Sequence, residues 1–258
     1  MRELCESDTP LTISAISTKL GIAPSSVHRA LESLVKARWV ERMATHQYRL
    51  AFEFYRLGAL AASRIKPVKL SRPLLAKLAI QCDETALFAM RIPGALQMLF
   101  AEQAESPQTL RYRFPLHEPR FLFWGAPARA ILAWMPEEQQ REALATAPPS
   151  ITNRRPPAWS TWEREAREVR QQGYAVTRGH YTNWAVGVAV PVFGLEQEVV
   201  GALTIIAPEM RVQRNSERRF ATALQVAAAH LSRSLGAPAS SQLFPRTTIQ
   251  IHSKDSHD

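Results

Sequence analysis

The feature that most constrains the fold is the stretch from Leu11 to Leu50, where two helical patterns around a glycine are followed by two short strand patterns. Apolar residues recur at helical spacing up to Leu20, and Gly21 then supplies a residue that ends a helix at little conformational cost. Pro24 suits the first turn of the next helix, because the N–H that it lacks would be unpaired there. This order predicts a winged helix-turn-helix over residues 1–51, a fold that places its second helix in the major groove of DNA.

The second helix of this motif has an apolar stripe formed by Val27, Leu31 and Leu34, and short or basic side chains on the opposite face. Such side chains can approach phosphates and base edges, and we expect one of the two serines also to cap the helix. Residues 39–41 and 48–50 alternate like the strands of a hairpin wing, whose arginines are expected to contact phosphates. The candidate DNA-binding residues are therefore Ser25, Ser26, His28, Arg29, Arg42 and Arg49.

Positive charge is concentrated in the same part of the chain. The protein has 32 Lys and Arg against 23 Asp and Glu. Residues 11–80 contain 12 of the basic residues, and their only acids are Glu32, Glu41 and Glu53, so the net charge of +9 arises in this segment. Such a field favours a polyanionic partner. A membrane surface is the alternative, but no stretch approaches the ~20 apolar residues of a spanning helix, so we expect double-stranded DNA and no membrane.

Length and cysteine content exclude several other classes. At 258 residues the chain has room for about two domains. Cys5 and Cys82 are the only cysteines, with no CxxC pair and no His spacing typical of metal ligands, so neither a metal, a disulfide nor a cofactor is expected. Residues 1–10 are polar and acidic and lack the apolar run of a signal peptide, which favours a cytoplasmic location.

The rest of the chain predicts a second domain of α+β class. After the wing, an amphipathic pattern predicts a linker helix within residues 52–71. Residues 72–236 then form an α+β domain with a central antiparallel sheet, and the polar, aperiodic residues 237–258 are expected to be a disordered tail. The predicted elements of the second domain are a helix at 72–82, strands at 85–90 and 96–102, a loop running into a helix at 124–135, a helix at 160–172, strands at 186–193 and 199–206, and a helix at 214–235.

Six segments, in this order, resemble the IclR family of bacterial transcription regulators. They are LTISAISTKLGIAPSSVHRALESL, WVERMATHQYRL, DET at 83–85, GAPARAILAWMP at 125–136, QQGYAV at 171–176, and the pair VGVAVPVFG and EVVGALTIIAP near the end. The resemblance spans residues 11–236. It implies a winged helix-turn-helix, a linker helix and a GAF-like ligand-sensing domain, assembled as a homodimer or tetramer. It also implies that a small metabolite alters the affinity for operator DNA, with repression the commoner mode and activation the alternative.

The resemblance places the effector against the loop at 124–126 and the late strands. The backbone N–H groups of that loop precede a helix whose positive end suits a small carboxylate. Phe123, Trp124 and Trp184 favour an aromatic or other partly apolar acid, and Trp184 stands where the family commonly has glycine, which predicts an altered pocket. Taken singly, each aromatic is better explained by core packing, and a turn role explains Gly125 and Asn183 equally well. The candidate effector-binding residues are Trp124, Gly125, Ala126, Asn183, Trp184, Val186 and Thr204.

The competing hypothesis is a small-molecule-metabolising enzyme fused to a basic module that binds DNA or a membrane surface. His180 and Tyr181, close to Asn183 in sequence, are side-chain types that general acid or base catalysis uses. The chain has no GxSxG, GxxxxGK or HExxH motif. We therefore expect a regulator rather than an enzyme, while the effector, the operator and the sign of regulation stay open.

Overall fold

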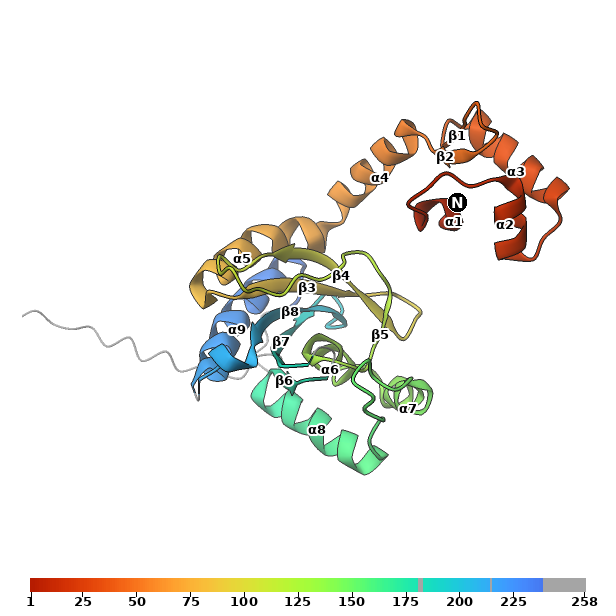
Figure 1. Ribbon diagram of the computed structural model, residues 1–258. Helices are drawn as coiled ribbons and strands as arrows, with labels where there is room; N and C mark the ends of the chain where they lie inside the picture. Colours follow the sequence, from red (N-terminus) through yellow and green to blue (C-terminus); the bar gives the residue numbers. More distant parts are fainter. Residues whose placement is uncertain (181–182, 214, 239–258) are drawn as a thin grey trace, which may run out of the picture. The chain divides into compact units, whose positions relative to one another are not determined.

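The computed structural model describes residues 1–180, 183–213 and 215–238, which divide into two compact units. The first unit is Met1–Ile65 and the second begins at Lys66. Figure 1 shows their elements coloured along the chain, and each unit is described by itself. No helix among the described residues is long and apolar enough to cross a membrane.

The first unit is a winged helix-turn-helix followed by one helix. Its elements are α1 (Arg2–Cys5), α2 (Ile13–Leu20), α3 (Pro24–Lys36), β1 (Val40–Arg42), β2 (Tyr48–Leu50) and α4 (Phe52–Arg64). The two strands pair antiparallel with Glu41 opposite Arg49, which gives the predicted wing. Buried apolar side chains from α1, α2, α3 and both strands form its core: Leu4, Ile16, Val27, Leu31, Val40 and Tyr48.

Local chemistry explains where the first helices begin and end. The Thr12 hydroxyl accepts a 3.2 Å hydrogen bond from the N–H of Ala15 and caps α2, and Gly21 ends this helix at a φ of 65°, which glycine adopts without strain. The predicted serine cap of α3 is wrong. The cap residue is Ala23, whose side chain cannot accept a hydrogen bond, and Pro24 lies in the first turn. Both serine hydroxyls therefore remain available on the outer face.

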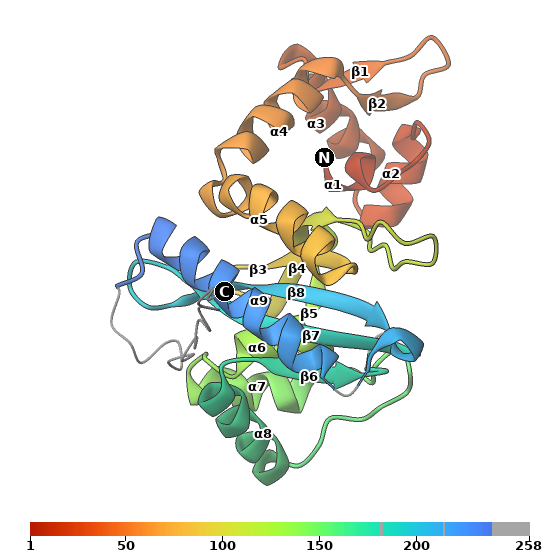
Figure 2. The same cartoon turned by 90° about the vertical axis from the view of Figure 1, so that its left-hand side faces the viewer.

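The second unit is built on a six-stranded antiparallel sheet with the strand order β5-β4-β3-β8-β7-β6. Figure 2 shows α9 lying across one face of this sheet, while α6 lies on the other. The strands are β3 (Thr85–Arg91), β4 (Gln97–Ala104), β5 (Arg120–Phe121), β6 (Ala175–Arg178), β7 (Ala185–Phe193) and β8 (Val199–Pro208). The helices are α5 (Lys66–Cys82), α6 (Ala126–Leu132), α7 (Glu137–Thr146), α8 (Trp159–Gln172) and α9 (Ser216–Ser234), with a 3₁₀ turn at Glu209–Arg211.

Strand alternation divides the interior into two cores. Along β7, Val188 and Val190 face α5 and α9, while Ala185 and Ala189 face α6. Every residue of β7 is buried, because helices cover the sheet on both sides. The α+β class and the central antiparallel sheet are thus confirmed.

Several predicted boundaries need correction. The helix expected to begin at Arg72 begins at Lys66, because Pro67 fits a first helical turn and residues 68 and 70 already pack on the core. Residues 66–71 are therefore the start of α5, although the sequence suggested a linker. Helices α1 and α7 and strands β5 and β6 were not predicted, since α1 and the two strands are very short and α7 is mostly polar. The predicted disordered tail lies, from residue 239 onward, outside the described residues.

Candidate effector pocket and DNA-reading surface

Helix α3 presents the predicted polar face to solvent. Ser25, Ser26 and Arg29 are exposed and His28 is partly exposed, whereas Val27 and Leu31 are buried in the core of the unit. His28 lies 3.9 Å from the carboxylate of Glu32, one turn along the same helix. The face that could enter a major groove is therefore free of packing within this unit.

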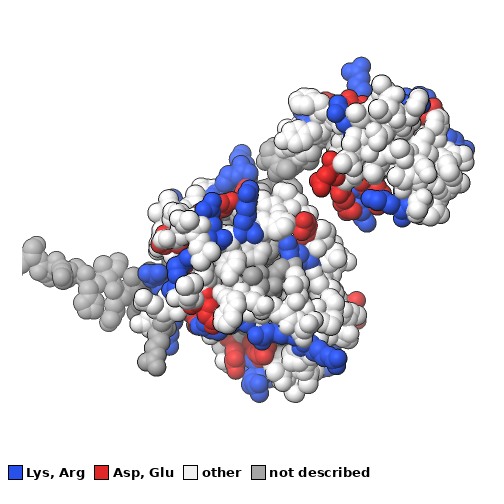
Figure 3. Space-filling model, in the orientation of Figure 1, with Lys and Arg blue, Asp and Glu red and all other residues white. Residues whose placement is uncertain are grey.

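The two wing arginines already have partners within the wing. Arg49 forms an ion pair with Glu41 on the opposite strand, and Arg42 lies 2.7 Å from Nδ1 of His46 at the hairpin tip. These pairs are exposed, and exposed ion pairs contribute little to stability. Both guanidinium groups could therefore exchange such a partner for a phosphate. Figure 3 shows basic side chains scattered over the visible face of the first unit rather than a continuous basic patch.

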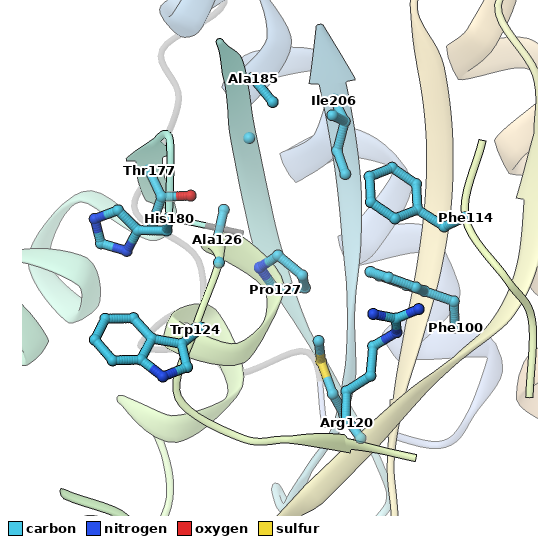
Figure 4. A pocket seen from close by; sticks show the side chains of 13 residues that line it. Phe100, Phe114, Arg120, Trp124, Ala126, Pro127, Thr177, His180, Ala185 and Ile206 are labelled. Atoms are coloured by element: carbon cyan, nitrogen blue, oxygen red, sulfur yellow. The ribbon is translucent and has the colours of Figure 1, made fainter. Parts of the chain in front are cut away.

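The second unit contains a pocket at the start of α6, which we call the α6 pocket (Figure 4). Its cavity volume is about 40 Å³, and the empty space around it including the mouth is about 450 Å³. The cavity volume is far below the roughly 300–1,000 Å³ of typical small-ligand sites, so the interior is narrow. The lining residues come from β4 to β8 and from the segments between these strands: Met98, Phe100, Phe114, Arg120, Trp124, Gly125, Ala126, Pro127, Thr177, His180, Ala185, Gly187 and Ile206.

The loop before α6 approaches the sheet closely. Gly125 has a φ of 86° and precedes the helix, and its carbonyl oxygen accepts the N–H of Arg129 at 3.1 Å. A Cβ atom on Gly187 of β7 would lie 3.2 Å from the Cβ of Ala126, so glycine there permits the close packing of α6. Helix α6 has seven residues, and Pro127 in its first turn offers no N–H. The backbone donors of this loop are therefore fewer than the sequence pattern suggests.

Arg120 and His180 lie on opposite sides of the largely apolar α6 pocket (Figure 4). The guanidinium of Arg120 lies over the ring of Phe100, 5.4 Å from its centroid, and 3.4 Å from the carboxylate of Glu118. Burial lowers the pKa of Arg120, although the charge of Glu118 acts in the opposite direction. Burial, with the charges of nearby arginines, lowers the pKa of His180 to about 4. His180 is therefore neutral at pH 7, and Arg120 supplies positive charge.

The structure brings together three of the seven predicted effector residues. Trp124, Gly125 and Ala126 line the α6 pocket. Val186 does not, because alternation along β7 turns its side chain to the face opposite Ala185. Thr204 lies on the same face of β8 as Ile206 but is fully buried, and its hydroxyl has no hydrogen-bond partner among the described residues.

Asn183 and Trp184 also lie outside the α6 pocket. Trp184 is 77% exposed and adopts a φ of 61°, and its indole does not line the α6 pocket. Its ring contributes to a separate shallow surface with Tyr112 and Met210. Asn183 is exposed, and its carbonyl oxygen accepts a 3.3 Å hydrogen bond from the Tyr112 hydroxyl. Phe123 is fully buried in the core below the loop.

Most residues that line the α6 pocket were not predicted from the sequence. Met98 and Phe100 alternate on β4, which was a usable signal once that strand was assigned. No periodic sequence pattern indicated Arg120, Phe114 or Thr177, because these residues lie in short or irregular segments. His180 was considered only as a catalytic group, and Tyr181 lies outside the described residues. Among those residues there is no cluster of three or more His, Cys, Asp or Glu side chains that could hold a metal ion.

A winged helix-turn-helix followed by an α+β domain with a small apolar pocket defines a class of one-component DNA-binding regulators. Two family profiles identify the class more closely. The bacterial transcriptional regulator IclR C-terminal domain matches residues 59–233, and the IclR helix-turn-helix domain matches residues 2–44. The chain therefore belongs to the IclR family and is a DNA-binding transcriptional regulator.

Individual relatives agree with this assignment. The HTH-type transcriptional regulator KipR of Bacillus subtilis is 28% identical over 88% of this chain and 90% of its own length. A solved IclR regulator from a Silicibacter species shares the fold, with a TM-score of 0.77, 24% identity and 92% coverage of both chains. An IclR homologue from Microbacterium hydrocarbonoxydans, solved in complex with 4-hydroxybenzoate, gives a TM-score of 0.72 with 20% identity, covering 89% of this chain and 93% of that one.

Proposed function

We propose that this regulator is a repressor whose affinity for its operator is changed by a small, partly apolar organic acid bound in the α6 pocket. The observation that carries the proposal is the composition of that pocket. Phe100, Phe114 and Ile206 offer apolar surface, and Arg120 places a cation at its edge. An acid with a ring or short alkyl body matches this combination, because the body is removed from water while the carboxylate meets a guanidinium.

The narrow interior favours a small acid. The cavity volume of the α6 pocket is only about 40 Å³. A planar ring therefore enters only if side chains such as Phe114 and Trp124 move. The relative that was solved with 4-hydroxybenzoate has the same fold. Aromatic monoacids of this size are therefore the first candidates for the effector of this chain.

We further propose that the protein acts as a homodimer or tetramer in the cytoplasm and has no catalytic activity. Helix α4 supports self-association, because Phe52 and Tyr55 are 78% and 72% exposed with their rings 6.5 Å apart. Two exposed aromatic residues on successive turns are a typical anchor of a protein interface. A second copy of α4 would cover them, and a dimer would present two recognition helices to a two-fold symmetric operator.

The test combines ligand binding with operator binding. Ala185 lines the α6 pocket, so Ala185→Leu fills space in it while leaving the DNA-binding unit untouched. We expect an aromatic monoacid that shifts operator affinity in the wild type to bind Ala185→Leu at least tenfold more weakly by calorimetry, with basal operator binding retained. Gly125 is a poorer choice, because its φ of 86° strains any side chain introduced there. Unchanged affinity of the acid for Ala185→Leu would show that it binds elsewhere.

A further inference from the structure

A second cavity shares Trp124 and His180 with the α6 pocket but differs from it in character. Its empty space is about 1,230 Å³ including the mouth, so it is larger and more open than the α6 pocket. Three arginines from two segments line it: Arg129 on α6, and Arg154 and Arg155 in the segment before α8. We call it the arginine cavity.

The positive charges of the arginine cavity are only partly balanced. Glu165 and Glu168 on α8 also line it, and Glu165 is paired with Arg129. Neither Arg154 nor Arg155 has a carboxylate within ion-pair distance among the described residues. Arg154 donates a 3.3 Å hydrogen bond to a backbone carbonyl oxygen of β6 and is otherwise exposed. The arrangement thus leaves positive charge available to an anion from solution.

Two buried nitrogen atoms in the wall of this cavity have no hydrogen-bond partner among the described residues. They are Nε of Arg129 and Nδ1 of His180. Arg129 is nine-tenths buried, with its guanidinium 5.2 Å from the centre of the Phe123 ring and 5.5 Å from that of the Trp162 ring. Buried polar atoms without hydrogen-bond partners are rare in folded proteins and commonly indicate a bound water, ion or ligand.

The same groups are electrostatically coupled. His180 is neutral at pH 7, since its pKa is lowered to about 4, first by burial and then by the charges of Arg129 and Arg154. A neutral imidazole still donates one N–H, which is Nδ1–H in one of its two tautomers. An anion placed among these three side chains would therefore meet two guanidinium groups and a further N–H donor.

We propose that the arginine cavity binds a carboxylate, which is held by Arg154 and accepts hydrogen bonds from Arg129 and His180. The carboxylate comes either from a separate small acid or from a second acid group on the effector itself. Because Trp124 and His180 line both cavities, occupancy of one is expected to change binding in the other. Only this coupling depends on the proposed effector role of the α6 pocket.

The first experiment uses acetate as the probe and the full-length protein. At pH 7 and constant ionic strength, maintained with chloride, acetate should perturb the ring resonances of His180 saturably in a ¹³C–¹⁵N correlation spectrum. Arg154→Gln should weaken this binding at least tenfold. Arg154 is exposed, so its replacement should leave the fold intact. The matched control is Arg141→Gln, which removes another exposed arginine whose guanidinium lies 3.9 Å from the Trp159 ring centre and outside the arginine cavity.

The outcome of the acetate titration decides the proposal. Saturable binding that is lost in Arg154→Gln and kept in Arg141→Gln supports it. No saturable change at His180, or equal affinity in all three proteins, overturns it. Ala185→Leu separates this result from the proposed effector site, because it should weaken the binding of an aromatic monoacid while saturable acetate binding that depends on Arg154 persists.

A second experiment distinguishes the two sources of the carboxylate. Calorimetry compares phenylacetate with 1,4-phenylenediacetate, which adds a second acid group to the same ring. If the diacid binds the wild type at least tenfold more tightly and loses this advantage in Arg154→Gln, the carboxylate belongs to the effector. If acetate binds but the diacid has no advantage, the arginine cavity takes a separate anion. If the diacid's advantage persists in Arg154→Gln, its second acid group binds elsewhere, which contradicts the effector as the source.

Discussion

At the scale of single residues, Arg29 offers the clearest test of the DNA-reading face. Its side chain is exposed on α3 opposite the buried Val27 and has no ion-pair partner among the described residues. If it contacts a base edge, Arg29→Ala should weaken specific operator binding by about 1–3 kcal/mol. Because the side chain is exposed, the thermal midpoint should hardly change.

A gel-shift titration with operator and scrambled DNA, alongside thermal unfolding, measures both effects. Lys36→Ala, at the far end of the same helix, is the matched control and should affect specific binding less. A large loss of stability in Arg29→Ala, with specific binding unchanged per folded molecule, would mean that the contacting face of α3 lies elsewhere.

His180 predicts a particular dependence of stability on pH. Its folded pKa is lowered to about 4 from an ordinary value of 6.5, with burial the larger cause and nearby arginines the smaller. Between pH 6.5 and 4 the imidazole of His180 binds a proton in the unfolded chain but not in the native state. The free energy of unfolding is therefore highest above pH 6.5, and the contribution of His180 is lost as the pH falls toward 4. Allowing for partial exposure, we expect a loss of about 1–2 kcal/mol.

Urea unfolding between pH 7.5 and 4.5 measures this contribution. His180→Gln removes the titrating group and keeps a polar side chain, so its stability should fall less over this range than that of the wild type. Parallel pH profiles for the two proteins would show that His180 is not held neutral in the native state.

At the scale of elements, α4 predicts how the chain self-associates. Replacing both Phe52 and Tyr55 with serine removes the two exposed aromatic anchors from this helix. Burial of one such side chain contributes roughly 1.5–3 kcal/mol, so the dimer dissociation constant should rise at least tenfold per residue. Sedimentation equilibrium measures the change, and Leu110→Ser, at an exposed apolar residue of the second unit, is the control. If Phe52 and Tyr55 can be replaced without weakening the dimer, α4 is not the interface.

At the scale of the whole molecule, the concentration of charge in one segment predicts a strong salt dependence. A dimer that places Arg42 and Arg49 of each chain on phosphates neutralises about four phosphate charges. The slope of log K against log salt should then be about −4, and Arg42→Gln should reduce its magnitude by about 2 per dimer. Fluorescence anisotropy of a labelled operator between 50 and 300 mM salt measures both slopes. A slope near zero would exclude phosphate contacts as the main source of affinity.

The sequence by itself determined the helix-turn-helix and the wing of the first unit and the main frame of the second. Helix α2, the turn at Gly21 and helix α3 follow from local periodicity and from residues whose backbone preferences are strong. Strands β7 and β8 follow from long apolar runs bounded by a polar turn. These features depend on near neighbours in the chain, so reading along the chain is sufficient to find them.

Only the tertiary structure decided which side chains meet in the α6 pocket. A shift of one residue along β7 exchanges Ala185 for Val186, because successive strand residues face opposite sides of the sheet. Arg120 reaches the pocket from a two-residue strand, and His180 from the segment after β6. Their positions depend on pairings between segments far apart in sequence, which no local pattern encodes. The loop before α6 was predictable from its glycine and proline, but the residues across from it were set by the register of the sheet.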